Sequence, residues 1–368
     1  MIYSQSSGSY QSSTASNQRH FIIDYFRGIV IIDMIFLHFS QHLTYFLRTL
    51  IKFSDIAAEG FIFLAGFMIG EHYLKKFVVN KKQVILRLFL RSVQLLLIHY
   101  IMILTISLPF YSYFQLKNWN HILTFLLSSF FFINQIPILH ILPTFIPLFL
   151  ISPLILTMLV YDWDYCLIFL SIMFFLLGCY NPYVFDEGEK TIFPVILWQI
   201  YFVLGIIVGK FREDFKNVNN NRLLIYAAIF YSFVFFMKYG GYFNVIHNIK
   251  STYNIYPKKF PLNIYGLLYG VSFLFFLYTV FFPIWTIIKK CHLISNILTL
   301  LGRHSLLTFV VHAYFVYLIK TFAALNFNKY IIYFSIILST YSIYCIISTI
   351  DKLLARNKLP TIYKRIFC

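Results

Sequence analysis

The chain has 368 residues, of which 60% are hydrophobic and only 12% are charged, and its mean hydropathy is +0.75. A soluble domain carries about 25% charged residues, so this composition excludes an ordinary soluble protein. The net charge of +17 is concentrated in short connections and at the C-terminus. This is expected for cytoplasmic loops that face anionic lipid, and it needs no nucleic-acid partner to explain it.

Long apolar runs separated by short polar connections predict an all-α, polytopic integral membrane protein. Residues 1–18 are polar and uncharged and lack the apolar region of a signal peptide, so we expect a disordered cytoplasmic tail. Residues 19–352 are predicted to form the transmembrane domain, and residues 353–368 a basic cytoplasmic tail. The apolar runs lie near residues 21–40, 54–70, 85–109, 121–135, 141–160, 165–180, 191–209, 222–239, 263–288, 304–320 and 330–350.

The charge of the connections sets the expected topology. The connection at 71–87 is strongly basic and is predicted to be cytoplasmic, which places the N-terminus on the same side. The later basic connections, at 210–222 and 289–290, are cytoplasmic as well only if residues 110–190 cross the membrane an even number of times. The shortest run, 121–135, is therefore expected to be a partial or interfacial helix. The sequence thus predicts about ten transmembrane helices, with both termini cytoplasmic.

The first apolar run, DYFRGIVIIDMIFLHFS, carries Arg27 and His38 eleven residues apart. Eleven residues are close to three helical turns, so both side chains share one face of the helix. Asp24 joins that face one turn before Arg27 and is its expected ion-pair partner. Ionisable residues inside a membrane helix are functional candidates by default. In the expected topology, Arg27 lies toward the cytoplasm and His38 toward the far side.

The next two runs add charged residues at both ends of this arrangement. Asp55 and Glu59 are four residues apart at the start of the second run, so they share a face near His38. Arg87 and Arg91 lie at the cytoplasmic start of the third run. A structural reading stays open, because an interfacial histidine can simply hydrogen-bond a headgroup and arginines after a basic loop can extend to lipid.

These residue types in this arrangement favour group transfer across the membrane. A histidine beside carboxylates suits a general base, since the carboxylate orients the ring and stabilises the imidazolium. Arginines bind phosphate oxygens in a fork geometry. Together they predict an activated acyl group on a phosphorylated carrier that enters from inside, and an acceptor outside.

An ordered set of motifs along most of the chain resembles the acyltransferase-three superfamily of membrane acyltransferases, and within it the OpgC family, which succinylates osmoregulated periplasmic glucans. The first-helix motif is followed by FSDIAAEGFIFLAGF, RLFLRSVQLLLIHY, ILPTFIPL, LWQIYFVLG, PLNIYGLLYGVSFLF and LLGRHSLLTFVVH. There are three departures. Arg87 and Arg91 are four residues apart where the superfamily has three, His140 stands where relatives have an acidic residue, and residues 210–260 match no family segment.

The resemblance implies a multi-pass O-acyltransferase of the bacterial inner membrane. The implied donor is an acyl-CoA, succinyl-CoA in this family, which acts as a co-substrate and not as a bound cofactor; no metal is implied. The implied acceptor is a hydroxyl of a periplasmic glucan. His38 becomes the general base, oriented by Glu59 or Asp55. The expected donor-binding residues are Arg27, Asp24, Arg87 and Arg91, and further site candidates by motif position are His99, His140, Trp198, Gln199, Arg303 and His312.

Two alternatives remain open from the sequence. The same chemistry could O-acetylate another surface polysaccharide. A secondary transporter or acyl exporter could use the same buried charges for a proton or anion path, although transporters often contain internal repeats and no repeat is evident in this chain.

Overall fold

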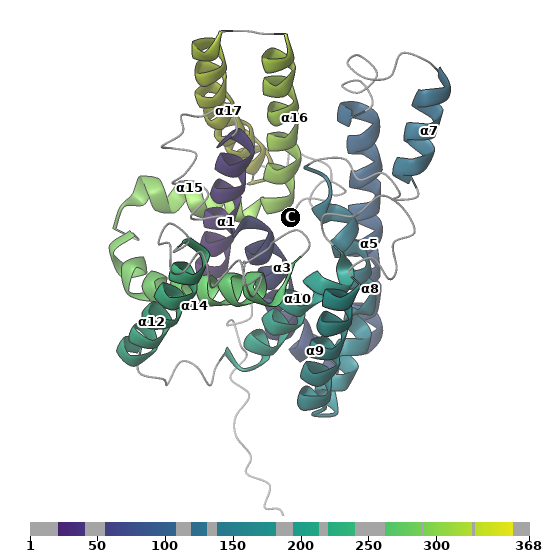
Figure 1. Ribbon diagram of the computed structural model, residues 1–368, viewed down its shortest axis with the longest axis vertical. Helices are drawn as coiled ribbons and strands as arrows, with labels where there is room; N and C mark the ends of the chain where they lie inside the picture. Colours follow the sequence, from purple (N-terminus) through teal and green to yellow (C-terminus); the bar gives the residue numbers. More distant parts are fainter. Residues whose placement is uncertain are drawn as a thin grey trace, which may run out of the picture.

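The computed structural model describes residues 21–40, 56–107, 119–130, 138–181, 194–212, 220–239, 262–288, 290–325 and 328–355 (Figure 1). Within these ranges the regular elements are helical, which confirms the expected all-α class. The predicted tail at 1–18, the residues from 356 onward and Asp55 lie outside the described residues. The last helix runs on to Ala355, slightly beyond the expected domain boundary.

The helices follow the predicted apolar runs in order. They are α1 (Phe21–Phe39), α3 (Ala57–Met68), the π-helical turn η3 (Ile69–Tyr73), α4 (Leu74–Val79), α5 (Lys81–Met102), the π-helical turn η4 (Ile103–Ser107), α7 (Trp119–Phe130), α8 (Ile141–Val160), α9 (Asp164–Tyr180), α10 (Val195–Lys210), α12 (Asn220–Tyr239), α14 (Ile264–Ile288), α15 (His292–Arg303), α16 (Ser305–Ala324) and α17 (Lys329–Ala355).

Four described segments are long and apolar enough to cross a membrane: Lys81–Ile106, Ile141–Val160, Ser305–Ala323 and Tyr330–Leu354. Shorter apolar helices cover Asp164–Tyr180, Val195–Lys210, Ile225–Phe235 and Ile264–Leu277. Helix α7 is described over 12 residues, Trp119–Phe130. Residues 131–135 of the predicted 121–135 run lie outside the described residues, so the partial helix stays a prediction.

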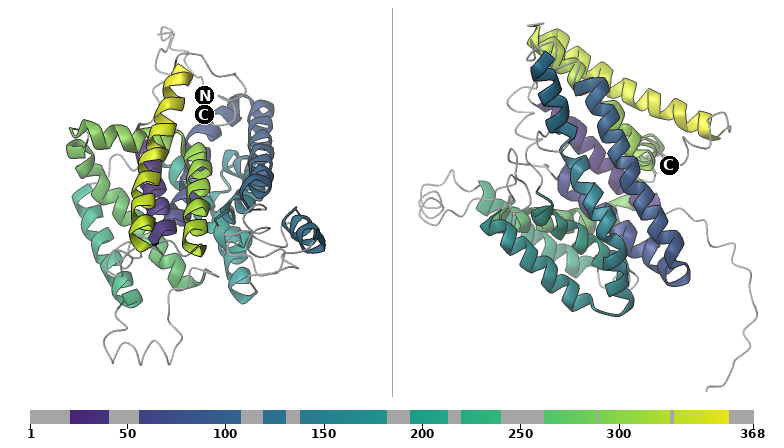
Figure 2. Two further views of the ribbon diagram at one scale, coloured as in Figure 1. Left: turned by 90° about the horizontal axis from the view of Figure 1, so that it is seen from above. Right: turned by 90° about the vertical axis from the view of Figure 1, so that its right-hand side faces the viewer.

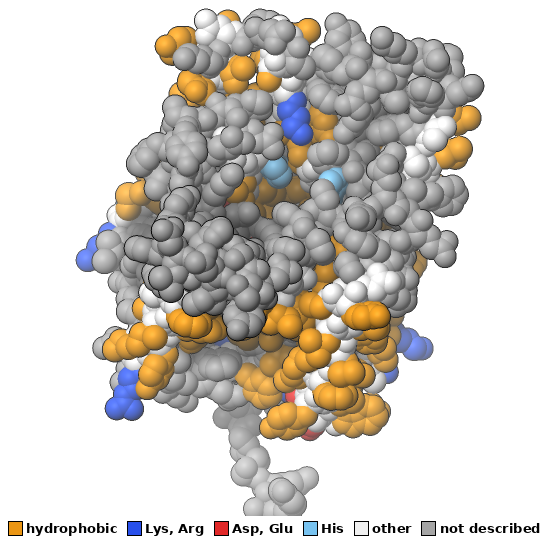
Figure 3. All heavy atoms as spheres, in the orientation of Figure 1, with side chains coloured by type: hydrophobic (Ala, Val, Ile, Leu, Met, Phe, Trp, Pro, Cys, Tyr) orange, Lys and Arg blue, Asp and Glu red, His pale blue; other side chains and the backbone are white. Residues whose placement is uncertain are grey.

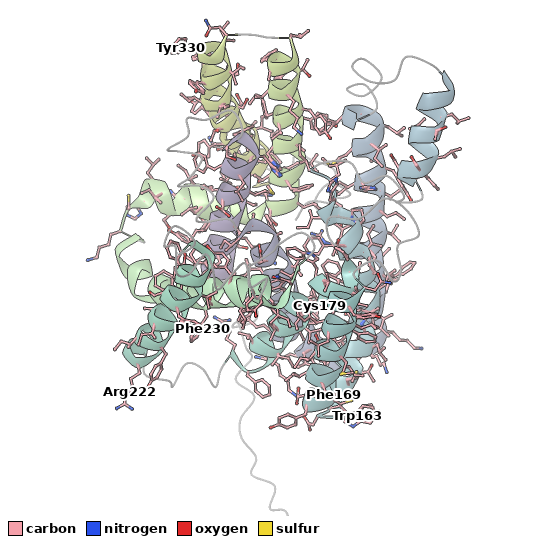
Figure 4. The ribbon with its side chains drawn as sticks, viewed as in Figure 1. Trp163, Phe169, Cys179, Arg222, Phe230 and Tyr330 are labelled. Carbon is pink, nitrogen blue, oxygen red and sulfur yellow. The ribbon has the colours of Figure 1, made fainter. Side chains whose placement is uncertain are left out.

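Three labelled residues mark the two ends of the molecule. Trp163, in the α8–α9 turn, and Arg222, at the start of α12, lie at the lower end of Figure 4, and Tyr330 lies at the upper end. At the lower end, Nζ of Lys210 pairs with Asp164 at 2.8 Å and Asp162 at 3.3 Å. These ion pairs join the end of α10 to the α8–α9 turn.

Two pairs of glycines bring α3 and α10 into backbone contact. A Cβ at Gly66 or Gly70 would overlap a backbone carbonyl of α10, and a Cβ at Gly205 or Gly209 would overlap a carbonyl of α3. The spacing small-xxx-small on both helices is typical of close helix packing in membranes. The contact fixes α3, which carries Glu59, against α10.

Replacing Gly205 with alanine is expected to lower the free energy of unfolding by about 1–3 kcal/mol, because an overpacked backbone contact must open. Gly178→Ala serves as the matched control, since its Cβ would meet the movable side chains of Leu197 and Ile196. Thermal unfolding in detergent measures both. Equal midpoints for the two variants would contradict the tight α3–α10 contact.

Helix α15 is an element that the sequence analysis did not predict. It packs across α1, and a Cβ at Gly302 would overlap the carbonyl of Asp24, while one at Gly28 would overlap that of Leu298. A second packing layer joins the other half of α1 to α16 and α17 through Ile35, Ile319 and Ile343 (Figure 2). Helix α1 is therefore held along its length by the C-terminal helices.

Candidate active site

Two histidines from distant parts of the chain meet between α1 and α16. Nδ1 of His38 lies 2.9 Å from Nε2 of His312, and the two rings are stacked at 5.1 Å with an angle of 17° between their planes. His312 is fully buried, while His38 is half-buried. The structure thus brings together two residues that the sequence analysis had proposed separately.

The backbone of α16 fixes which nitrogens carry protons. Nδ1 of His312 lies 2.6 Å from the carbonyl oxygen of Phe309, and because a carbonyl only accepts, this nitrogen is the donor. In a neutral ring Nε2 is then an acceptor, so Nδ1 of His38 donates to it. The basic lone pair of a neutral His38 is therefore on Nε2. A histidine whose Nδ1 proton is held by an acceptor in this way can act as a general base through Nε2.

Two more histidines follow or precede residues of one apolar cluster, whose members are given below. His99 of α5 and His140, directly before α8, are buried and lie within electrostatic range of each other. Figure 3 shows two histidine side chains on one face of the molecule, below a Lys or Arg side chain that lies over α16. The cluster, here called the site cluster, contains Met34, Ala57, Leu95, Ile98, Met102, Ile103, Ile106, Leu139, Leu142, Leu306, Phe309, Ala313 and Tyr317.

The histidine pair lies well inside the helical bundle. His312 is 12 residues before the end of α16 at Ala324, which places it about 18 Å along the helix from that end. His38, by contrast, is the second-last residue of α1. Helix α1 therefore ends at the level of the pair, while α16 and α17 continue beyond it (Figure 1).

Glu59 is buried in the first turn of α3, and its described neighbours belong to other helices. It lies within electrostatic range of Tyr201 of α10, and its Cγ would be 3.0 Å from a Cβ added to Gly270 of α14. These contacts place Glu59 at the junction of α3, α10 and α14.

Asp33 of α1 is a buried residue that the sequence analysis did not single out. Its Oδ2 accepts the backbone N–H of Ile56 at 3.1 Å, directly before α3. A carboxylate there stabilises the positive end of the helix dipole. Asp33 thus positions the helix that carries Glu59. The signal was the cost of a buried carboxylate, which must find donors.

The predicted basic residues gather at the other end of α1. Arg27 forms the expected ion pair with Asp24, with Nη1 3.8 Å from Oδ1. Arg91 of α5 donates to Oε1 of Gln94 at 2.9 Å and lies within electrostatic range of Arg27. Arg87, one turn earlier on α5, is exposed. Each of these two guanidinium groups has a polar partner on its own helix, Asp24 for Arg27 and Gln94 for Arg91.

The remaining candidates take part in helix packing. The side chain of Gln199 both donates to the Ser171 carbonyl and accepts from its hydroxyl, each at 2.8 Å, which joins α10 to α9. Trp198 is fully buried beside Tyr201, at 5.6 Å between ring centroids. Arg303 and the adjacent His304 bind Asp351 of α17 at 3.4 and 2.7 Å; neither His304 nor Asp351 had been predicted.

Comparison with known proteins identifies a family over almost the full length. The family model described as OpgC protein matches residues 19–353. No curated protein and no solved structure matches the chain.

Proposed function

The chain belongs to the OpgC protein family, and we propose that it transfers a succinyl group from cytoplasmic succinyl-CoA to hydroxyls of a periplasmic glucan. Membership of the family implies an acyltransferase activity in general, and several described helices are long and apolar enough to cross a membrane. The bacterial inner membrane, the acyl-CoA donor and the glucan acceptor are parts of the proposal.

The observation that carries the proposed mechanism is the contact between His38 and His312. The acceptor hydroxyl gives its proton to Nε2 of His38 while its oxygen bonds to the thioester carbonyl carbon. The tetrahedral intermediate then expels the CoA sulfur, which takes the proton back from Nε2 and leaves as the thiol. The acyl group remains on the acceptor as an ester. In this proposal His312 orients His38, and its Nε2 stabilises the transient imidazolium. The expected roles of Glu59 and Asp55 stay predictions.

The basic residues suit the phosphates of the donor. Arg27 and His38 are separated by about 16 Å along α1. A CoA ester with its phosphates at Arg27 would therefore need an extended pantetheine arm to bring its thioester to His38. Arg27, held by Asp24, and Arg91 would bind the phosphate oxygens. Arg87, exposed one turn nearer the start of α5, would meet the donor first.

Neutralising Arg91 as Arg91→Gln is expected to lower kcat/KM for an acyl-CoA by about 10- to 100-fold, because a charge-assisted hydrogen bond is lost. The loss should appear mainly in KM. With an acyl-pantetheine donor, which has no phosphate, the variant should equal the wild type. Lys82→Gln, an exposed change on the same helix, is the control. A loss with both donors would show that Arg91 does not act on phosphate.

The reaction itself is tested with purified protein, succinyl-CoA and periplasmic glucan. The proposal expects free CoA to be released only when glucan is present, and mass spectrometry to find succinyl esters on the glucan. Transfer that occurs only with another polysaccharide would show that the acceptor is that polysaccharide and not the glucan. Absence of CoA release with any glycan, together with acyl movement into sealed vesicles, would favour an exporter.

A further inference from the structure

Lys320 is a cation close to the histidine pair that the proposed mechanism does not use. It is the one Lys or Arg residue of α16, eight residues after His312, and it is half-buried. Its Nζ lies 5.3 Å from the centroid of the Tyr317 ring. Tyr317 is buried in the site cluster. Among the described residues, no carboxylate forms an ion pair with Lys320 within 4 Å.

The contact of the Lys320 ammonium differs from that of a simple lipid anchor. A lysine near the end of a membrane helix usually extends toward the headgroups, which for α16 means toward Ala324. The ammonium instead lies over the ring of Tyr317, three residues earlier and so on the His312 side of Lys320 in the helix. Successive residues turn by about 100°, so Lys320 shares the helix face of Phe309 and Ala313, which also belong to the site cluster.

The spacing fits a short dicarboxylic acyl group. The ammonium lies near the level of Tyr317, which is five residues, or about 7.5 Å of rise, from His312. Three carbon–carbon bonds of about 1.5 Å join the thioester carbonyl of a succinyl group to its free carboxylate. A charge-assisted hydrogen bond adds about 2.8 Å. A carbonyl at His38 would therefore place the carboxylate within reach of Lys320.

We propose that Lys320 binds the free carboxylate of the acyl group and makes the site selective for a dicarboxylic acyl donor. This inference rests on the proposed acyl transfer and assigns a residue to the selection of its donor. The ion pair between a half-buried ammonium and a carboxylate inside the bundle is strong, because the low dielectric there strengthens the attraction between the two charges. A neutral acyl group of the same length leaves the cation, within the described part of the chain, with the Tyr317 ring.

The test compares succinyl-CoA with butyryl-CoA, which has the same chain length and no carboxylate. In the wild type, kcat/KM and equilibrium affinity without acceptor should both favour succinyl-CoA. In Lys320→Met this preference should fall by about 10- to 100-fold, while butyryl transfer persists. Lys352→Met, an exposed change on α17, should keep the wild-type preference.

A charge reversal guards against a folding defect as the explanation. Lys320→Glu should prefer the CoA ester of 3-aminopropionate, whose terminus is cationic, over succinyl-CoA, and a misfolded protein cannot gain this preference. An unchanged ratio of succinyl to butyryl affinity in Lys320→Met would overturn the role of Lys320 while leaving acyl transfer intact. Selective binding without glycan-dependent CoA release would instead retain Lys320 and reject the proposed function.

Discussion

Replacing His38 with alanine is expected to lower the rate of acyl transfer by about 10²- to 10⁴-fold, the usual contribution of a general base. The side chain is half-buried at the end of α1, so its removal should leave protein level, membrane insertion and thermal stability close to those of the wild type. The rate is measured as CoA release with saturating acyl-CoA and glycan. The loss should appear in kcat, because the base acts on the reacting hydroxyl and not on the phosphates.

A second histidine provides the matched control. His72 in η3 is exposed and bonded to Lys76 at 2.7 Å, so His72→Ala should keep full activity. Near-normal transfer by His38→Ala would reject His38 as the base and with it the mechanism. A loss of folded protein in His38→Ala but not in His72→Ala would mean that the histidine pair mainly stabilises the contact between α1 and α16.

Local sequence patterns were enough to predict the fold class and one face of the site. The eleven-residue spacing of Arg27 and His38 needs only the helical repeat, and the Asp24–Arg27 ion pair follows from one turn of the same helix. The small-xxx-small spacing of Gly205 and Gly209 can be read from one turn of helix, and the structure places Gly66 and Gly70 opposite it. In each case the information lies within about three turns of one helix.

Contacts between distant segments were not predictable from such patterns. His38 and His312 are 274 residues apart, and nothing in either helix specifies the other as its partner. A carboxylate near His38 was the expected orienting group because carboxylates commonly orient catalytic histidines. Helix α15 was missed because its 12 residues are too few for a span and follow a basic turn. Its apolar residues at 293, 294, 297, 298 and 301 show the helical period that could have found it.

The role of His312 predicts a contrast between two substitutions of similar size. His312→Phe cannot accept the hydrogen bond from Nδ1 of His38, so the ring of the base loses its fixed tautomer and orientation. Transfer should then fall by about 100-fold, the cost expected when a reacting group is misplaced by about 1 Å. His312→Gln offers a carbonyl oxygen as an acceptor and should recover at least about a tenfold part of that loss, worth roughly 1.4 kcal/mol.

The double variant His38→Ala/His312→Phe separates positioning from packing. If His312 acts only through His38, its loss adds nothing once the base is absent, so the double variant should transfer acyl groups as slowly as His38→Ala alone. A purely structural role for the fully buried His312 would lower the rate further in the double variant and would lower the melting temperature of both His312 variants alike. Recovery of rate in His312→Gln without a matching change in melting temperature therefore assigns His312 to the orientation of the base.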